Sequence, residues 1–207
     1  MLTLIHSPQS RSSRIVTLID EMGIKDWINI ETVGILRQDG SGGHDPANPH
    51  PEGKVPLLID GTAVIRESGA IIQYLTDMFP DAGLGRPVDH AQRGDYISWL
   101  HWYGSVMEPV LVFGTAGLQH PFLTATFRGT EEVAAKLRAA LQHRPYLLGD
   151  AYSAADLLVH SPYAWFGDAT PDDPAIKDWV ARCMARPSVA RTKTSDAALM
   201  GQAAAAA

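Results

Sequence analysis

Residues 48–74 read NPHPEGKVPLLIDGTAVIRESGAIIQY, and this stretch decides the fold of the chain. Two short apolar runs, residues 57–59 and 63–65, flank Asp60-Gly61. An Asp-Gly pair between apolar runs predicts a β-hairpin, because both residues tolerate the positive φ angles of a tight turn. Apolar residues then recur at near-helical spacing up to Phe79, and Pro80 ends the run, which predicts a helix directly after the hairpin.

Two details of this stretch suggest a binding role. Pro56 begins a strand, where proline is tolerated, and a cis Val55-Pro56 bond would leave the Val55 backbone free to pair with an extended peptide. Glu67-Ser68 begins a helix, whose free N–H groups suit a carboxylate. The residues alone leave open a plain hairpin followed by a helix, with Glu67 only favourable in its first turn.

The pattern Gly53-Lys54-Val55-Pro56-Leu57 followed by Glu67-Ser68 resembles the glutathione-binding segment of cytosolic glutathione transferases. The resemblance implies a cis bond before Pro56 and a Val55 backbone that pairs with the cysteinyl part of glutathione. It implies that Glu67 and Ser68 hold the γ-glutamyl end. His50 and Lys54 are then expected near the glycyl carboxylate, although a loop histidine without a ligand explains His50 equally well.

The segments before this stretch predict a strand, a helix and a second strand. Residues 2–5 and 27–33 are strand-like, and an amphipathic helix is expected from Ser10 or Ser12 to Met22, with Gly23 as its cap. A strand–helix–strand unit places its two strands parallel. With the hairpin they form a four-stranded mixed sheet, so we expect an α/β thioredoxin-like domain over residues 1–80.

Residues 81–87 carry two glycines and a proline and are expected to be a linker. An all-α domain is expected over residues 88–207, with helices over 90–117, 122–143, 175–185 and 187–199, where Pro109 should kink or reset the first. Ser153-x-x-Asp156 before an apolar run predicts a capping box with Asp in place of Glu. The same segment is similar to the capping motif of the transferase helical domain, which implies a role in folding.

The residue that contacts the glutathione thiol is expected in residues 6–14, which read HSPQSRSSR. This loop contains neither tyrosine nor cysteine, and its Ser-Arg-Ser-x-Arg pattern resembles the helix start of serine-type bacterial and fungal transferases. We therefore expect Ser10 to be the donor to the thiolate, with Ser12 second, Ser7 third, and Arg11 fixing the serine or contacting substrate. A serine cluster that only caps the helix is the alternative, and His6 is expected to be structural.

A hydrophobic substrate pocket is expected on the long helix of the second domain. Tyr103 and Met107 lie one helical turn apart and are the expected pocket residues. Residues 101–104, His-Trp-Tyr-Gly, depart from the small residues common at this point in related bacterial enzymes. The class of electrophile therefore stays open.

Composition excludes several other classes of function. The net charge is −6 with no basic patch, so nucleic acid is not an expected partner. The single cysteine, Cys183, cannot form an internal disulfide and is expected to be buried. No segment reads as a signal peptide or membrane span, and no histidine cluster has metal-ligand spacing. A cytoplasmic protein without a metal or cofactor is expected, with glutathione as co-substrate.

These observations predict a glutathione transferase with a role in detoxification. It would use the thiolate of reduced glutathione for conjugation to, or displacement at, a hydrophobic electrophile. A glutathione-binding scaffold without turnover is one alternative. A glutathione-dependent isomerase or etherase is another, because one fold hosts several such reactions. A homodimer is expected from the resemblance alone.

Overall fold

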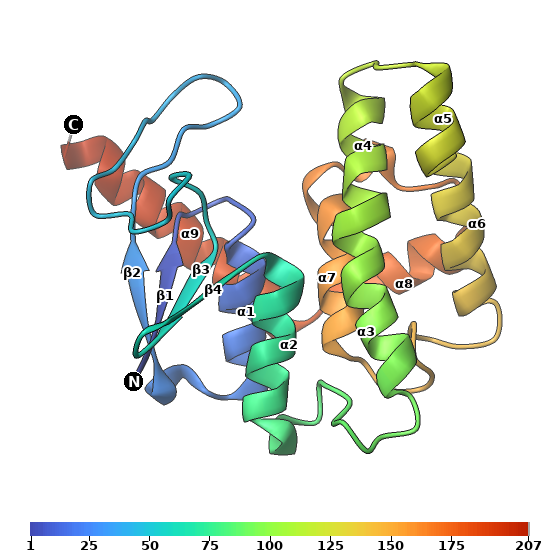
Figure 1. Cartoon of the computed structure of the whole chain (residues 1–207), viewed down its shortest axis with the longest axis horizontal. Coiled ribbons are helices and arrows are strands. Elements are labelled where there is room, and N and C mark those ends of the chain that lie inside the picture. The colour runs from blue at the N-terminus through green and yellow to red at the C-terminus, as the bar shows by residue number, and fades with distance from the viewer. Residues whose placement is uncertain (207) are drawn as a thin grey trace. The chain divides into compact units, whose positions relative to one another are not determined.

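A four-stranded mixed sheet forms the first part of the chain, as the sequence predicts (Figure 1). The computed structural model describes residues 1–206, with side chains described up to residue 202. The strands are β1 (Leu2–His6), β2 (Ile28–Thr32), β3 (Leu57–Asp60) and β4 (Ala63–Arg66). They are arranged in the order β2-β1-β3-β4, where β1 and β2 are parallel and the other pairs are antiparallel.

The strand register brings three chain segments to one end of the sheet. Ile5 near the end of β1 is opposite Leu57 at the start of β3, and Leu57 is opposite Arg66 at the end of β4. Ile5 and Leu57 are buried in one apolar cluster with Val33, against which Val55 packs. The loop after β1, the residues before β3 and the residues after β4 therefore meet at this end.

Three helices accompany the sheet: α1 (Ser13–Met22), α2 (Ser68–Met78) and α9 (Pro187–Ala206). α1 buries Ile15, Leu18 and Ile19. It ends at Gly23, whose φ of 68° is the left-handed conformation that glycine adopts without strain.

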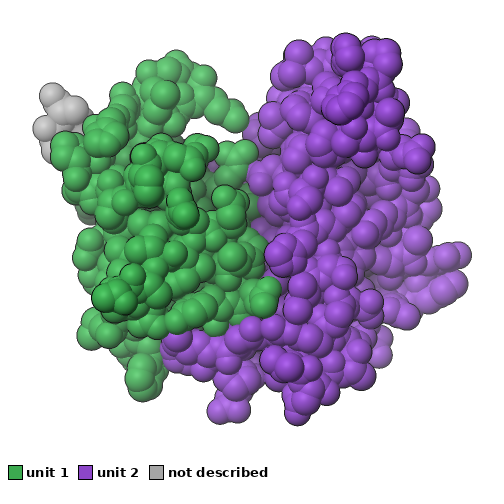
Figure 2. Space-filling model, in the orientation of Figure 1, with its two compact units in different colours: residues 1–75, 186–207 green, residues 76–185 purple. Residues whose placement is uncertain are grey.

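The last helix belongs with the sheet, which differs from the predicted domain boundary. The chain divides into one compact unit of residues 1–75 with the segment from Arg186 onward, and a second of residues 76–185 (Figure 2). Within the first unit α9 and the residue before it contact α1: Arg186 pairs with Glu21, and Thr17 donates a hydrogen bond to Thr192 of α9. The sequence predicts a helix here but carries no signal for these pairings.

The second unit is helical throughout its regular structure. The expected long helix consists of α3 (Arg93–Trp102), a π-helical segment (Tyr103–Met107) and α4 (Glu108–Thr115). Pro109 at the start of α4 has no N–H to donate and its ring crowds the preceding turn, which accounts for the wider π-helical turn before it. The prediction that Pro109 resets the helix is confirmed.

The second predicted helix, residues 122–143, is divided in two. α5 (Pro121–Phe127) ends at Arg128, which has a φ of 67°, and α6 (Thr130–Leu141) begins after Gly129, which has a φ of 128°. Two successive residues with positive φ cannot continue a right-handed helix, so the prediction of a single helix over residues 122–143 was wrong. The remaining elements are α7 (Ala154–Trp165), α8 (Pro174–Met184) and the short 3₁₀ helices Lys25–Trp27, Pro80–Ala82 and Gly167–Ala169.

A buried carboxylate organises the start of α7. Asp156 is fully buried and accepts hydrogen bonds from the backbone N–H groups of Leu147 (2.8 Å) and Ser153 (3.0 Å), the Ser153 hydroxyl (2.7 Å) and the Trp179 indole (2.9 Å). The predicted capping box is therefore present. Burial raises the pKa of Asp156 although these donors work against the rise.

Two further expectations concern single features of the chain. Cys183 in α8 is fully buried, as predicted. Within the described residues, every helix is too short or too polar to span a lipid bilayer.

Candidate functional site

The loop after β1, which we call the serine loop (residues 7–12), brings the predicted serines together. α1 begins at Ser13, so Ser12 is the N-cap residue. Ser7 and Ser12 are buried, at 1% and 0% exposure, whereas Ser10 is partly exposed and Arg11 is exposed. Among these three serines, only Ser10 therefore offers a hydroxyl at the surface.

Short hydrogen bonds hold the Ser10 hydroxyl. Its Oγ lies 2.7 Å from both the Ser7 carbonyl oxygen and the Ser12 Oγ, and it accepts a hydrogen bond from the Ser12 N–H at 3.2 Å. The loop turns at Gln9, whose φ of 52° is unusual for a residue other than glycine. The residues around Ser10 thus hold its hydroxyl in place at the end of the sheet described above.

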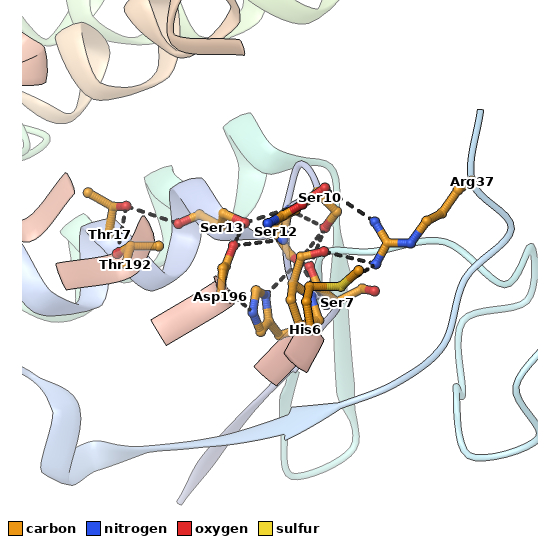
Figure 3. Close-up of polar contacts among 12 residues, drawn as sticks. His6, Ser7, Ser10, Ser12, Ser13, Thr17, Arg37, Thr192 and Asp196 are labelled. Carbon is orange, nitrogen blue, oxygen red and sulfur yellow. Dashed lines mark hydrogen bonds and ion pairs between the residues drawn. The ribbon is translucent and has the colours of Figure 1, made fainter. Parts of the chain in front are cut away.

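A buried histidine and aspartate lie behind the serine loop (Figure 3). His6 is 1% exposed; its Nδ1 lies 2.7 Å from Ser12 Oγ and its Nε2 lies 3.1 Å from Asp196 Oδ1. The second carboxylate oxygen of Asp196 accepts hydrogen bonds from the Gln9 N–H (2.7 Å) and the Ser13 hydroxyl (2.5 Å). α9 thereby contributes a charged group to the loop.

The environment of Asp196 favours its ionised form. Burial opposes ionisation, but the hydrogen bonds from His6, Ser13 and Gln9 outweigh it and lower the pKa of Asp196. Asp196 carries no signal in the sequence, because it follows His6 by 190 positions and lies in the middle of a helix.

Arg37 adds a positive charge beside the serine loop. It comes from the long segment after β2, and its guanidinium donates hydrogen bonds to the carbonyl oxygens of Pro8 (3.0 Å) and Gln9 (3.5 Å) (Figure 3). Arg37 was not predicted as a site residue, because the Gly-rich segment that carries it has no regular pattern.

The predicted glutathione residues lie around the same end of the sheet. The Val55-Pro56 bond is cis, as predicted, and β3 begins one residue later. Glu67 follows β4 with a φ of 68°, and its carbonyl accepts the Ile71 N–H at 2.9 Å. A non-glycine residue in this conformation carries local backbone strain, and such strain is concentrated at binding sites. Ser68 then begins α2.

A polar cavity of about 430 Å³ brings several of these residues together. Its lining includes three predicted residues, His50, Lys54 and Glu67, and two that the sequence analysis did not identify, Glu52 and Arg66. His50 is 8% exposed, and its Nδ1 accepts the Glu52 N–H at 3.0 Å, which fixes the ring. Lys54 pairs with Glu52 at 2.5 Å, and this cation lowers the pKa of Glu52. Cationic and anionic groups together suit a zwitterionic peptide.

The two predicted pocket residues lie in the π-helical segment of the second unit. Tyr103 is 2% exposed and Met107 is fully buried. Both contribute to the packing of that unit, and their contact with a substrate stays a prediction. Among the described residues, His, Cys, Asp and Glu side chains form no group of three or more that is placed to hold a metal ion.

The family of the chain follows from sequence models of its two parts. Residues 4–83 match the glutathione S-transferase N-terminal domain, and residues 120–187 match the glutathione S-transferase C-terminal domain. The matches together span well over half of the chain and agree with the fold. The chain belongs to the glutathione S-transferase family, with a thioredoxin-like N-terminal domain and a helical C-terminal domain.

Individual relatives are distant. An uncharacterized GST-like protein from Streptococcus mutans is 29% identical over 202 residues, which cover 85% of this chain and 74% of the relative. The crystal structure of a glutathione transferase from Methylococcus capsulatus is 27% identical, with a TM-score of 0.72 and coverage of 95% and 99%. A sphingomonad glutathione S-transferase complexed with glutathione is 24% identical, covers 94% and 98%, and has a TM-score of 0.72.

Proposed function

We propose that this protein is a serine-type glutathione transferase. It binds reduced glutathione at the end of the sheet where β1, β3 and β4 meet, converts the thiol to a thiolate beside Ser10, and adds it to a hydrophobic electrophile. The observation that carries the proposal is the register, which brings the serine loop, the cis Val55-Pro56 bond and Glu67 to one end of the sheet.

The glutathione residues divide into three groups by chemistry. The Val55 backbone pairs with the cysteinyl part of the peptide, as an added strand would. Ser68 and the strained Glu67 receive the γ-glutamyl end, where a helix N-terminus favours a carboxylate. His50 and Lys54, which line the polar cavity with Arg66, receive the glycyl carboxylate. The glutathione held by the sphingomonad relative supports this choice of ligand.

Ser10 then acts on the thiol. A free thiol has a pKa of about 8.5, and hydrogen-bond donors and helix N-termini lower it. The Ser10 hydroxyl is held at the surface one turn before α1, where both influences act. Ser12 is fully buried, so it supports Ser10 rather than contacting the sulfur. Arg11, exposed beside Ser10, fixes the serine or contacts a carboxylate on the substrate.

The proposal extends to the electrophile site, the oligomeric state and the type of reaction. Tyr103 and Met107 contribute to the electrophile site, and a homodimer in the cytoplasm with a detoxifying role is the proposed setting. The serine loop contains no cysteine, which favours addition or displacement at an electrophile over mixed-disulfide exchange.

Ser10→Ala tests the proposal. A hydrogen bond to a charged group is worth about 1.5–3 kcal/mol, so kcat/KM with a general aryl halide should fall about 10- to 100-fold. The thiolate absorbance of bound glutathione should shift to higher pH. Ser41→Ala, an exposed serine outside the serine loop, is the matched control and should leave both values unchanged.

Other outcomes separate the alternatives. Glutathione binding measured by calorimetry, without conjugation of any electrophile, would favour the scaffold function. Turnover confined to aryl ethers or to isomerisation would favour the etherase or isomerase function. Unchanged activity in Ser10→Ala would remove Ser10 from the mechanism.

A further inference from the structure

A continuous chain of polar contacts runs from the surface to a buried carboxylate (Figure 3). Ser10 Oγ lies 2.7 Å from Ser12 Oγ, and Ser12 Oγ lies 2.7 Å from His6 Nδ1. His6 Nε2 lies 3.1 Å from the carboxylate of Asp196. Every link is within hydrogen-bond distance, and Ser10 at one end is the partly exposed member.

The number of hydrogen bonds that Ser12 can make limits where the protons lie. A hydroxyl has one hydrogen and two lone pairs, and one lone pair of Ser12 accepts the Ser7 N–H at 3.0 Å. One hydrogen and one lone pair remain for His6 Nδ1, Ser10 Oγ and the Ser7 carbonyl oxygen, which lies 3.1 Å from Ser12 Oγ. An ionised Asp196 only accepts, so His6 Nε2 carries a hydrogen and the protonation of Nδ1 sets the direction of the chain.

Two of the proton arrangements that satisfy this limit connect His6 Nδ1 with Ser10 Oγ through the Ser12 hydroxyl. With Nδ1 unprotonated, Ser12 donates to His6 and Ser10 donates inward, to Ser12 or to the Ser7 carbonyl. With Nδ1 protonated, His6 donates to Ser12, Ser12 donates to Ser10, and Ser10 has its hydrogen available for a group outside. The second arrangement presents a donor to a thiolate and places a positive charge two hydroxyls behind it.

We propose that His6, backed by Asp196, accepts the proton of the glutathione thiol through the Ser10 and Ser12 hydroxyls. The S–H proton passes to Ser10 Oγ, the Ser10 proton to Ser12 Oγ, and the Ser12 proton to His6 Nδ1. Each hydroxyl gains one proton and loses one, so the products are a thiolate and an imidazolium. This inference rests on the proposed function and adds a base that acts through the serines.

Burial excludes a different use of the same residues. Ser, His and Asp in contact also form the triad of nucleophilic hydrolases. Ser12 and His6 are 0% and 1% exposed, however, so Ser12 cannot reach an external substrate. The exposed end of the chain is Ser10, which fits proton transfer from a bound group rather than attack on it.

The charges around His6 come from several elements. Asp196 of α9 contacts its ring, and its ionised carboxylate stabilises an imidazolium. Arg37 from the segment after β2 contacts the serine loop, while Arg11 precedes α1 and Arg14 lies in its first turn. Glu31 on β2 is exposed beside β1. The positive charges of these arginines oppose a further positive charge on the His6 ring. The Asp196 carboxylate is therefore required to stabilise the imidazolium.

Proton counting tests the relay directly. Glutathione binding is measured at pH 7.5 by calorimetry in buffers of different ionisation enthalpy, and the thiolate formed is measured by absorbance. If His6 accepts the proton, the wild-type protein releases close to no protons per thiolate. A wild-type release close to one proton per thiolate would overturn the relay and leave Ser10 as a simple donor.

Two variants make the assignment specific to His6. His6→Asn keeps a polar group beside Ser12 but cannot hold the proton, so the release should rise to about one per thiolate, with thiolate formation shifted to higher pH. Thr192→Val removes a hydrogen bond between α1 and α9 one turn from Asp196, and its count should equal that of the wild type. A wild-type count in His6→Asn would also overturn the relay.

The outcomes separate this inference from the function it rests on. Absence of thiolate in the wild-type protein would overturn the proposed function, and the relay with it. The wild-type count decides the relay even if His6→Asn does not fold. In that case, nitrogen-15 spectra of the histidine rings should show one imidazole becoming an imidazolium as glutathione saturates the protein; unchanged ring signals would overturn the relay.

Discussion

Two buried aspartates, one in each unit, are surrounded by hydrogen-bond donors but differ in pKa. The pKa of Asp156 is raised, because burial outweighs donors that are all uncharged: backbone N–H groups, a hydroxyl and an indole. At Asp196 burial also raises the pKa, but the hydrogen bonds from His6, Ser13 and Gln9 outweigh it and the pKa is lowered. The balance between burial and hydrogen bonding therefore differs between a carboxylate that holds a fold and one that can stabilise a charge.

The two aspartates also differ in whether their hydrogen-bonded contacts extend to the protein surface. The partners of Asp156 are all buried backbone and side-chain groups of the second unit. Asp196 connects through His6 and Ser12 to the partly exposed Ser10. Change at Asp156 should therefore affect folding, and change at Asp196 should affect the chemistry proposed for Ser10.

The largest expected effect is the loss of the Asp156 carboxylate. Asp156→Ala leaves the N–H groups of Leu147, Ser153 and Trp179 without this acceptor, at about 1–3 kcal/mol for each buried donor. The free energy of unfolding, measured by urea denaturation, should fall by about 3–5 kcal/mol. Asp150→Ala, an exposed aspartate in the same loop, should change it by less than about 0.5 kcal/mol. Equal losses in both variants would contradict a special role for Asp156.

A smaller effect is expected in the pH dependence of the free energy of unfolding, and its sign differs between Asp156 and Asp196. Asp156, with a raised folded pKa, binds its proton more readily when folded, so its contribution improves as the pH falls through that pKa. The contribution of Asp196, with a lowered folded pKa, is present above the unfolded pKa of about 3.9 and is lost as the pH falls further.

Unfolding free energies of the wild type, Asp156→Asn and Asp196→Asn between pH 7 and pH 3 would measure these contributions. The difference between wild type and Asp156→Asn should grow as the pH falls. The difference for Asp196→Asn should shrink below about pH 4. Two slopes of the same sign would remove the contrast between the two carboxylates.

The smallest effect is expected at an exposed ion pair between α1 and α9. Arg191 on α9 lies 2.6 Å from Asp20 on α1, and its side chain is 56% exposed. Exposed pairs contribute about 0–1 kcal/mol, so Arg191→Met should lower the free energy of unfolding by less than about 0.5 kcal/mol. The pH dependence of thiolate formation should not change. A shifted thiolate titration would mean that any charge between α1 and α9 matters, and Asp196 would lose its distinction.

Local sequence pattern predicted the features that depend on neighbours in the chain. The hairpin around Asp60-Gly61, the cis bond before Pro56, the break at Pro109 and the Ser153–Asp156 cap each follow from the conformations that a few adjacent residues prefer. The glutathione residues were expected through a family pattern that is also local in sequence.

Features that depend on distant pairings could not be predicted in this way. The sequence after Pro187 predicts a helix but not which unit that helix packs on, and Asp196 looks like any polar residue on such a helix. His6 was expected to be structural. Its meaning depends on a partner 190 positions away.

The distance between His6 and Asp196 along the chain has a consequence during synthesis. The serine loop is made before the helical unit, and Asp196 follows after that entire unit. At 5–20 residues per second, about 10–40 s separate the two residues. A nascent chain whose sheet has already formed would still lack the carboxylate behind His6. The proposed proton transfer to His6 therefore cannot occur on the ribosome until α9 emerges.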